Sequence, residues 1–143
     1  MRVAIGAAII RDGGILLVKK KQSWILPGGK PEFGEDDISC LCREVREELS
    51  GTEVEVIRFY KGFEGMAPHK GDKILAKVYF ADIKGELHRH SAEIDAAEWV
   101  KNTKKYSLSD VTSKILASLQ KDGYLRCHYR HNLYISHKIK SSL

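Results

Sequence analysis

The sequence predicts an α/β domain built on a mixed β-sheet. Stretches typical of strands stand before and after one central helix, and a second amphipathic helix follows them. This order is the one expected of a layered α/β domain. The 143 residues suffice for one domain with its own core and are too few for two. We therefore expect a domain over residues 1–122 and a basic tail over residues 123–143.

The first two strands are predicted at residues 3–10 and 15–18, two apolar runs joined by Arg-Asp-Gly-Gly. An Asp-Gly pair between such runs predicts a β-hairpin. The first run is too short for a signal peptide or a membrane span. Residues 19–22 are polar and are expected at a loop edge near the functional site that is described below. Residues 24–27 are expected to be extended, because the residue before a proline avoids the helical region.

The central helix is predicted to begin at an Asp36 or Asp37 N-cap and to end before Gly51. At 100° per residue, an apolar stripe about 80° wide forms on one side. It holds Ile38, Leu41, Val45 and Leu49.

The rest of the chain predicts three strands and a closing helix. The strands are expected at residues 53–63, 73–83 and 97–100, and the helix from the Ser-Leu-Ser-Asp of 107–110 to about residue 119. Residues 62–72, with three glycines and a proline, predict a long mobile hairpin loop able to close over a ligand. Residues 84–96 are polar and irregular.

The net charge of +5 is concentrated in the tail. Residues 123–143 carry four basic side chains and no acidic one, whereas the remainder carries 20 basic and 19 acidic groups. A nearly neutral body argues against a nucleic-acid binder on charge alone. Contact of the aromatic, basic tail with RNA or an acidic partner stays open, although we expect a loosely docked end. Cys127, His128 and His131 lack a fourth zinc ligand at the usual spacing.

The three cysteines form no Cys-x-x-Cys pair and are odd in number. We therefore expect a reducing, cytoplasmic compartment and no disulfide framework.

Glu44, Glu47 and Glu48 crowd another part of the central helix, within an arc of about 100°. Like charges three or four residues apart cost about 0.2–0.5 kcal/mol per pair. Divalent cations that prefer oxygen ligands would remove this repulsion. The alternative is a solvated acidic face offset by Arg43 and Arg46.

Seven positions over twenty residues form a specific motif, Gly-x5-Glu-x7-Arg-Glu-(apolar)-x-Glu-Glu. Together with the preceding Trp-Ile-Leu-Pro-Gly, this stretch resembles the Nudix box of the Nudix hydrolases. The resemblance implies an α/β/α sandwich over residues 1–120. Ser50 stands where the family has a glycine, and Gly51 follows one residue late. The motif positions are Gly29, Glu35, Arg43, Glu44, Val45, Glu47 and Glu48.

The resemblance also implies roles for these residues. Glu47 and Glu48 are expected as the main Mg²⁺ carboxylates, Glu44 as a third ligand or the base that activates water, and the Gly29 carbonyl as a ligand. Mn²⁺ is a possible substitute for Mg²⁺. Arg43 is expected to brace the loop against the helix through a charged hydrogen bond to Glu35.

A further glutamate from a later loop completes the site in many relatives. Glu93 is the candidate, since it precedes the strand at 97–100, and Glu64 is second. An exposed loop acid is an equal alternative for Glu93 and the preferred alternative for Glu64. Trp24, Phe33 and Phe63 can stack on a base or pack in the core or loops.

The implied reaction is attack of water on a phosphorus of a nucleoside diphosphate linked to another group. A modified nucleoside triphosphate is preferred, because the chain is compact and carries no extra dimerisation domain. The alternatives are ADP-ribose or another nucleotide sugar, an RNA 5′ end, and a non-catalytic nucleotide-sensing module. The three intact glutamates argue against the last. Monomer and homodimer stay open, and the box does not identify the substrate, the general base or the number of metal ions.

Overall fold

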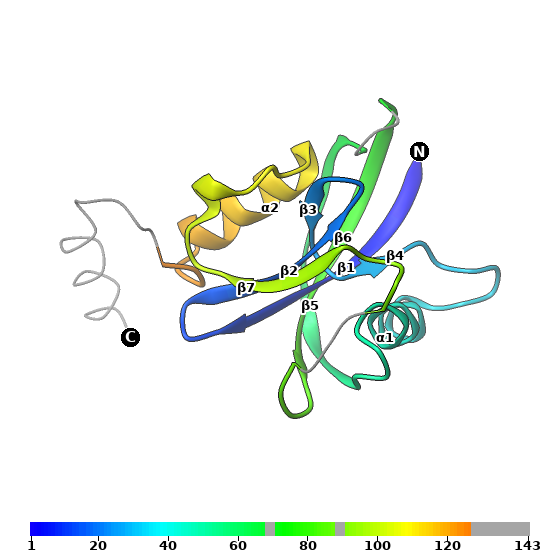
Figure 1. The fold of residues 1–143 in the computed structure, drawn as a ribbon. Helices are drawn as coiled ribbons and strands as arrows, with labels where there is room; N and C mark the ends of the chain where they lie inside the picture. The colour runs from blue at the N-terminus through cyan, green and yellow to red at the C-terminus, as the bar shows by residue number, and fades with distance from the viewer. Residues whose placement is uncertain (68–70, 88–90, 127–143) are drawn as a thin grey trace.

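The computed structural model describes residues 1–67, 71–87 and 91–126. Figure 1 shows strands between two helices that lie on opposite sides of them. The helices are α1 (Asp37–Glu48) and α2 (Asp110–Lys121), and a short 3₁₀ turn, η1 (Thr103–Lys105), precedes α2. The strands are β1 (Arg2–Arg11), β2 (Gly14–Lys20), β3 (Ser23–Ile25), β4 (Gly28–Gly29), β5 (Val54–Met66), β6 (Lys73–Ile83) and β7 (Ala96–Val100).

The sheet is mixed, as the sequence predicts. Its main path runs β3-β2-β1-β6-β5, with β4 paired to β1 and β7 paired to β2. β1 and β6 pair in parallel, and the other pairs are antiparallel. The parallel pair needs a long crossover, and that crossover carries α1.

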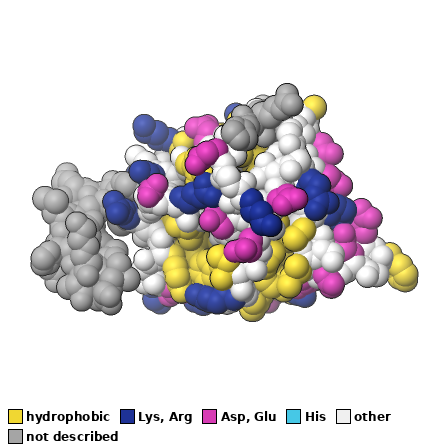
Figure 2. Space-filling view, turned by 90° about the horizontal axis from the view of Figure 1, so that it is seen from below, with side chains coloured by type: hydrophobic (Ala, Val, Ile, Leu, Met, Phe, Trp, Pro, Cys, Tyr) yellow, Lys and Arg dark blue, Asp and Glu magenta, His cyan; other side chains and the backbone are white. Residues whose placement is uncertain are grey.

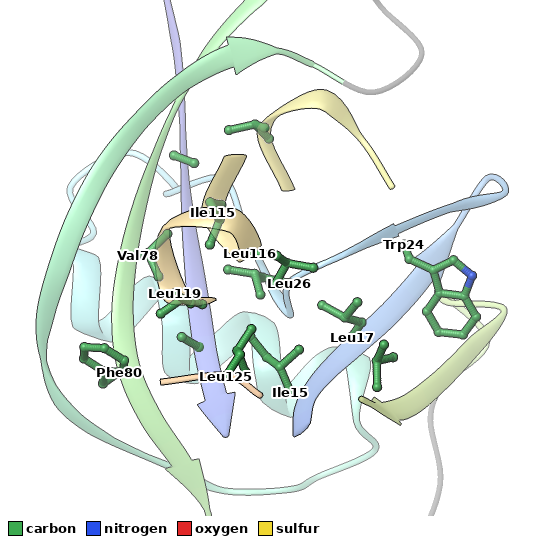
Figure 3. Close-up of a cluster of buried hydrophobic side chains, with 14 residues drawn as sticks. Ile15, Leu17, Trp24, Leu26, Val78, Phe80, Ile115, Leu116, Leu119 and Leu125 are labelled. Carbon is green, nitrogen blue, oxygen red and sulfur yellow. The ribbon is translucent and has the colours of Figure 1, made fainter. Parts of the chain in front are cut away.

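Both faces of the sheet are buried, which explains why β1 and β2 read as continuous apolar runs. Alternate residues of β1 and β2 enter two separate cores, because successive side chains of a strand point to opposite faces. One core packs under α1 and the other under α2. Figure 3 shows Ile115, Leu116 and Leu119 of α2 directed onto the second core. The predicted α/β/α sandwich is confirmed.

Two local signals act as the sequence predicts. Asp12 and Gly13 both take positive φ, at 52° and 79°, which is the requirement of a two-residue hairpin turn. The carboxylate of Asp36 accepts a 2.7 Å hydrogen bond from the backbone N–H of Ser39 and caps α1.

The expected apolar stripe of α1 is partly wrong. Ile38 is 53% exposed, whereas Cys40 and Glu48 join Leu41 and Val45 on the buried side. Ile38 lies about 60° from Leu41 around the helix, and Glu48 lies about 20° from it. The acid therefore occupies a position that an apolar residue would normally fill.

The long mobile loop expected at 62–72 is also wrong over its first half. β5 continues to Met66, and Gly62 to Met66 pair with β6 down to Lys73. Register shifts near Val56 and Phe59 let this long strand follow the twist of the sheet.

The core extends past the predicted boundary at residue 122. Leu125 is buried in the core under α2, and Tyr124 packs its ring 4.7 Å from that of Phe80. The N–H of Arg126 reaches the carbonyl of Gly13 at 3.5 Å. The remaining tail, with the residues weighed as zinc ligands, lies outside the described residues.

No helix in the described ranges is both long and apolar enough to cross a membrane. Large hydrophobic side chains that remain exposed include Phe33, Ile57 and Phe59. Figure 2 shows hydrophobic surface gathered across one face, with basic and acidic side chains interleaved around it.

Candidate active site

Glu48 is the innermost of the three clustered glutamates and has no exposed surface. Its Oε1 accepts a 3.0 Å hydrogen bond from the backbone N–H of Gly28. Its Oε2 lies in an ion pair with the ammonium of Lys20. Within the described residues this oxygen has no hydrogen bond of ordinary geometry. The carboxylate is thus fixed by one donor and balanced by one cation.

Arg43 connects the glycine-rich loop to α1. Its Nε and Nη2 donate to the two carboxylate oxygens of Glu35, both at 2.8 Å, which is the predicted brace. Its Nη2 also donates to the carbonyl of Lys30 at 3.2 Å. Its Nη1 donates to Glu44 at 3.0 Å and to Glu47 at 3.5 Å. One guanidinium therefore orders the loop and two of the clustered carboxylates together.

The two glycines of β4 allow the loop to approach both neighbours closely. Gly28 has φ of 143°, and a Cβ there would lie 2.0 Å from the carbonyl oxygen of Ile5. A Cβ on Gly29 would lie 2.4 Å from the carboxyl carbon of Glu44. The thiol of Cys40 faces the Gly29 carbonyl oxygen at 3.7 Å. A side chain at position 28 would therefore collide with β1, and one at position 29 would collide with the carboxylate of Glu44.

The local environment shifts the pKa values of three of these carboxylates in different directions. Hydrogen bonds from Arg43 lower the pKa of Glu35 to about 2. Burial raises the pKa of Glu48 to about 7, even though Lys20 and the Gly28 N–H favour its ionised form. Burial also raises the pKa of Glu44, against the opposing effect of Arg43. Buried carboxylates of this kind are common at functional sites.

The donor set fits a divalent metal ion. Carboxylate and carbonyl oxygens are the ligands that Mg²⁺ prefers. The lack of a Cβ on Gly29 lets the carboxylate of Glu44 lie directly against the loop that carries the Gly29 carbonyl. In the described part of the chain, however, no three acidic, histidine or cysteine side chains converge as a ligand cluster. Instead, Glu44 and Glu47 are drawn onto Arg43, and Glu48 onto Lys20.

The two later glutamates lie in different parts of the fold. Glu93 is exposed, and its N–H is bonded to the hydroxyl of Ser91. The same loop reaches the end of α1, because the N–H of Ser91 donates to the carbonyl of Glu48 at 2.8 Å. Glu64 lies within β5 rather than in a loop, and its carbonyl accepts a hydrogen bond from the ammonium of Lys114 in α2. Glu93 is therefore carried to the neighbourhood of the site, and Glu64 is not.

The three aromatic residues considered for base stacking differ in their exposure. Trp24 is buried in the core under α2, with its ring edge-on to Tyr106 at 5.0 Å. Figure 3 shows it at the margin of that core. Phe63 packs partly buried against the same core, and Phe33 is fully exposed.

A small apolar cavity of about 110 Å³ lies on the α2 face of the sheet, bordered by Gly28 and Gly29. Its polar lining is a pair of hydroxyls at the start of α2, where Ser109 donates to Thr112 at 2.8 Å. The other lining residues are Ala4, Ile5, Gly6, Ile25, Leu26, Ile74, Ala76, Val78, Val111 and Ile115. The two glycines thus separate this cavity from the acidic face of α1.

Sequence reasoning placed residues 19–22 near the site but missed the pairing of Lys20 with Glu48. It also missed Ser109 and Thr112. The strand alternation of Leu16 and Val18 places Lys20 on the α1 face, but its partner lies 28 residues away. Ser109 reads as an ordinary helix cap, because it also accepts from the N–H of Thr112.

Sequence comparisons relate the chain to known proteins. A family model described as NUDIX domain matches residues 1–112. A MutT-like protein of Streptomyces ambofaciens is 31% identical over 101 residues, covering 68% of this chain and 62% of that protein. The chain therefore spans less than two thirds of the length of that relative.

Solved structures give the same result. A MutT NUDIX hydrolase from Burkholderia pseudomallei is 32% identical with a TM-score of 0.65, over 83% of this chain and 95% of its own. The E. coli ORF135 protein is 28% identical with a TM-score of 0.66, over 84% and 91%. An ADP-ribose pyrophosphatase from Streptococcus suis shares the fold at 21% identity and a TM-score of 0.65, over 90% and 94%.

Proposed function

Because the chain belongs to the Nudix family of pyrophosphate-bond hydrolases, we propose that it is a Mg²⁺-dependent pyrophosphohydrolase of a small nucleotide. The preferred substrate is a modified nucleoside triphosphate. The main support for this proposal is the buried carboxylate of Glu48, which accepts a hydrogen bond from Gly28. This carboxylate lies between the acidic face of α1 and the apolar cavity. The free thiols of Cys40 and Cys42 accord with the cytoplasmic location that we propose.

The metal would be held by the carboxylates of Glu44, Glu47 and Glu48 and by the carbonyl of Gly29. When bound, Mg²⁺ or Mn²⁺ neutralises pyrophosphate charge and makes water a better nucleophile. Glu48 is fixed by the Gly28 N–H, so the deepest ligand is oriented in advance. Arg43 and Glu35 keep the loop at its place over the helix.

Glu44 is the candidate to accept the proton of the attacking water. It is partly buried, its pKa is raised, and it lies against Gly29 at the meeting point of loop and helix. A base of raised pKa takes a proton more effectively near neutral pH. Glu93 is the second candidate, because its loop contacts the end of α1 through Ser91.

The apolar cavity supports a nucleotide substrate. Its volume of about 110 Å³ is small next to the roughly 300–1,000 Å³ of pockets for drug-sized ligands, which suits a single planar group such as a nucleobase. A base in this cavity would extend its phosphates across Gly28 and Gly29 towards α1. Nucleotide sugars, such as the substrate named for the Streptococcus suis relative, and RNA 5′ ends are the alternatives.

The deciding experiment is a screen of the purified protein, with Mg²⁺ or Mn²⁺, on nucleoside triphosphates, nucleotide sugars and 5′-triphosphorylated RNA. We expect a nucleoside triphosphate to be cleaved fastest, with the products identified by mass. Preferred cleavage of another class would replace this substrate. Absence of metal-dependent cleavage across the panel would favour a nucleotide-sensing module.

Glu47→Gln tests the metal assignment on the best substrate of that screen. It should lower kcat by at least about a hundredfold with the fold intact, because a metal carboxylate is lost. Glu55→Gln, an exposed glutamate of β5, is the matched control and should leave kcat unchanged. Equal activity of Glu47→Gln and wild type would contradict the assignment.

A further inference from the structure

Lys20 ends β2 at a place where its side chain must lie on the α1 face. Leu16 and Val18 enter the core under α1, so Lys20, two residues further, points to the same side. A two-residue turn follows at once, with positive φ at Lys21 and Gln22, and pairs Lys20 with Ser23. The end of the sheet therefore fixes the backbone of Lys20 and the face from which its side chain leaves.

The ammonium contacts Oε2 of Glu48, the oxygen that lacks a hydrogen bond of ordinary geometry among the described residues. Glu48 has no exposed surface, whereas about a third of the Lys20 side chain is exposed. A buried carboxylate without a nearby cation is strongly destabilising. Lys20 is thus the cation that lies against this buried carboxylate and offsets its negative charge.

We propose that Lys20 is the internal counter-ion of Glu48 and that Mg²⁺ must displace it from this carboxylate to bind. This inference rests on the proposed function, because it takes Glu48 as a metal ligand. Lys20 is a positioning residue here, since it acts through Glu48. Its long flexible chain, already partly in solvent, can swing away at little cost when a metal takes its place.

The inference has two measurable consequences. Loss of the ammonium should make Mg²⁺ bind more tightly, because the metal no longer competes with a resident cation. The same change should destabilise the metal-free protein more than the Mg²⁺-saturated one. A purely structural role of Lys20 would lower both melting temperatures equally.

The experiment compares wild type with Lys20→Met, Lys20→Arg and Lys19→Met. Lys19 is the matched control, because its neighbour Leu17 shows that alternate residues of β2 face the α2 core. Mg²⁺ alone is titrated by calorimetry from pH 7 to pH 9, and affinities are compared on the alkaline plateau, where proton competition has ended. Melting temperatures are measured in EDTA and in saturating Mg²⁺. If Lys20→Met does not fold, Lys20→Gln, which keeps a donor towards Glu48, takes its place.

We expect Lys20→Met to bind Mg²⁺ roughly tenfold more tightly, the low end of the coupling between close charge pairs, because Lys20 is partly in solvent. Lys20→Arg, which keeps the cation, and Lys19→Met should bind like wild type. The melting temperature of Lys20→Met should fall in EDTA and recover towards wild type in Mg²⁺. Unchanged or weaker Mg²⁺ binding by Lys20→Met would overturn the inference alone. A wild type that binds no Mg²⁺ would overturn the proposed function as well.

Discussion

Glu48 couples stability to pH. Burial raises its pKa to about 7, so the folded protein holds the proton of this group more tightly than the unfolded chain, whose glutamates titrate near 4.5. Its contribution to stability is therefore complete below about pH 4.5 and is lost as the pH rises through about 7.

We expect the unfolding free energy in EDTA to fall between pH 5 and pH 8 by at most about 3 kcal/mol more in wild type than in Glu48→Gln. Glutamine keeps the shape of the side chain and cannot ionise. Denaturant titrations of both proteins at several pH values make the measurement. Parallel pH profiles would show that Glu48 does not titrate in this range.

Ser50 occupies a backbone conformation that favours glycine. Its φ is 44°, and Gly51 follows at 83°. Gly51 therefore does not take over the role of the glycine that the family has at position 50. Positions 50 and 51 both adopt the left-handed backbone conformation, and Ser50 must adopt it with a side chain. A side chain in this region costs about 1–2 kcal/mol.

Ser50→Gly should raise the unfolding free energy by about 0.5–1 kcal/mol, since relief of strain exceeds the added freedom of the unfolded chain. The control is Ser113→Gly on the exposed side of α2, which should lower it by about 0.5 kcal/mol. Denaturant melts measure both. A destabilised Ser50→Gly would mean that the hydroxyl makes a contact worth more than the strain.

At the scale of the elements, α1 explains both the success and the limit of sequence reasoning. The cap at Asp36 and the brace between Arg43 and Glu35 follow from local spacing, and both are present. The rotation of α1 about its axis against the sheet does not follow from spacing. The apolar stripe therefore predicts Ile38 on the buried side, whereas the structure exposes it. Glu48 lies about 20° from Leu41 around the helix, so its spacing alone predicts a buried position. Its charge is the reason that it is not counted among the core residues.

The strand pair β1–β6 forms the floor of the apolar cavity, which gives an element-scale test. Ala4 lines the cavity, whereas Val3 packs towards the core under α1. Ala4→Leu should raise KM for the best nucleotide roughly tenfold with little change in kcat, because it removes binding shared by ground and transition states.

Val3→Leu is the control, because it introduces the same side chain on the opposite face of β1, and it should leave KM unchanged. Steady-state kinetics with both variants decide the matter. An unchanged KM for Ala4→Leu would place the base elsewhere.

At the scale of the molecule, the order of the layers is predictable from the sequence. The contacts between segments that are far apart in the chain are not. Continuous apolar runs in β1 and β2 indicate a sheet covered on both faces, and the hairpin at Asp12-Gly13 is local. The pair of Lys20 with Glu48 and the burial of Leu125 join segments far apart in the chain. No spacing rule within one element reports such contacts.

Leu125 also defines where the tail can be cut. A chain ending at Arg126 should match the full chain in melting temperature and small-nucleotide hydrolysis, because it keeps the described core. A chain ending at Asp122 should lose about 2 kcal/mol of unfolding free energy through the lost burial of Leu125. Weaker turnover of RNA alone by the chain ending at Arg126 would support the RNA alternative. Equal stability of the two truncations would contradict the role of Leu125.

The parallel pairing of β1 with β6 has a consequence for synthesis on the ribosome. Arg2 pairs with Ile74, 72 residues later, so the central strand emerges long before its main partner. α1 is made in the interval, when the face it covers is still incomplete. Because long-range pairing slows folding, we expect the acidic helix to reach its final position only after β6 has left the exit tunnel.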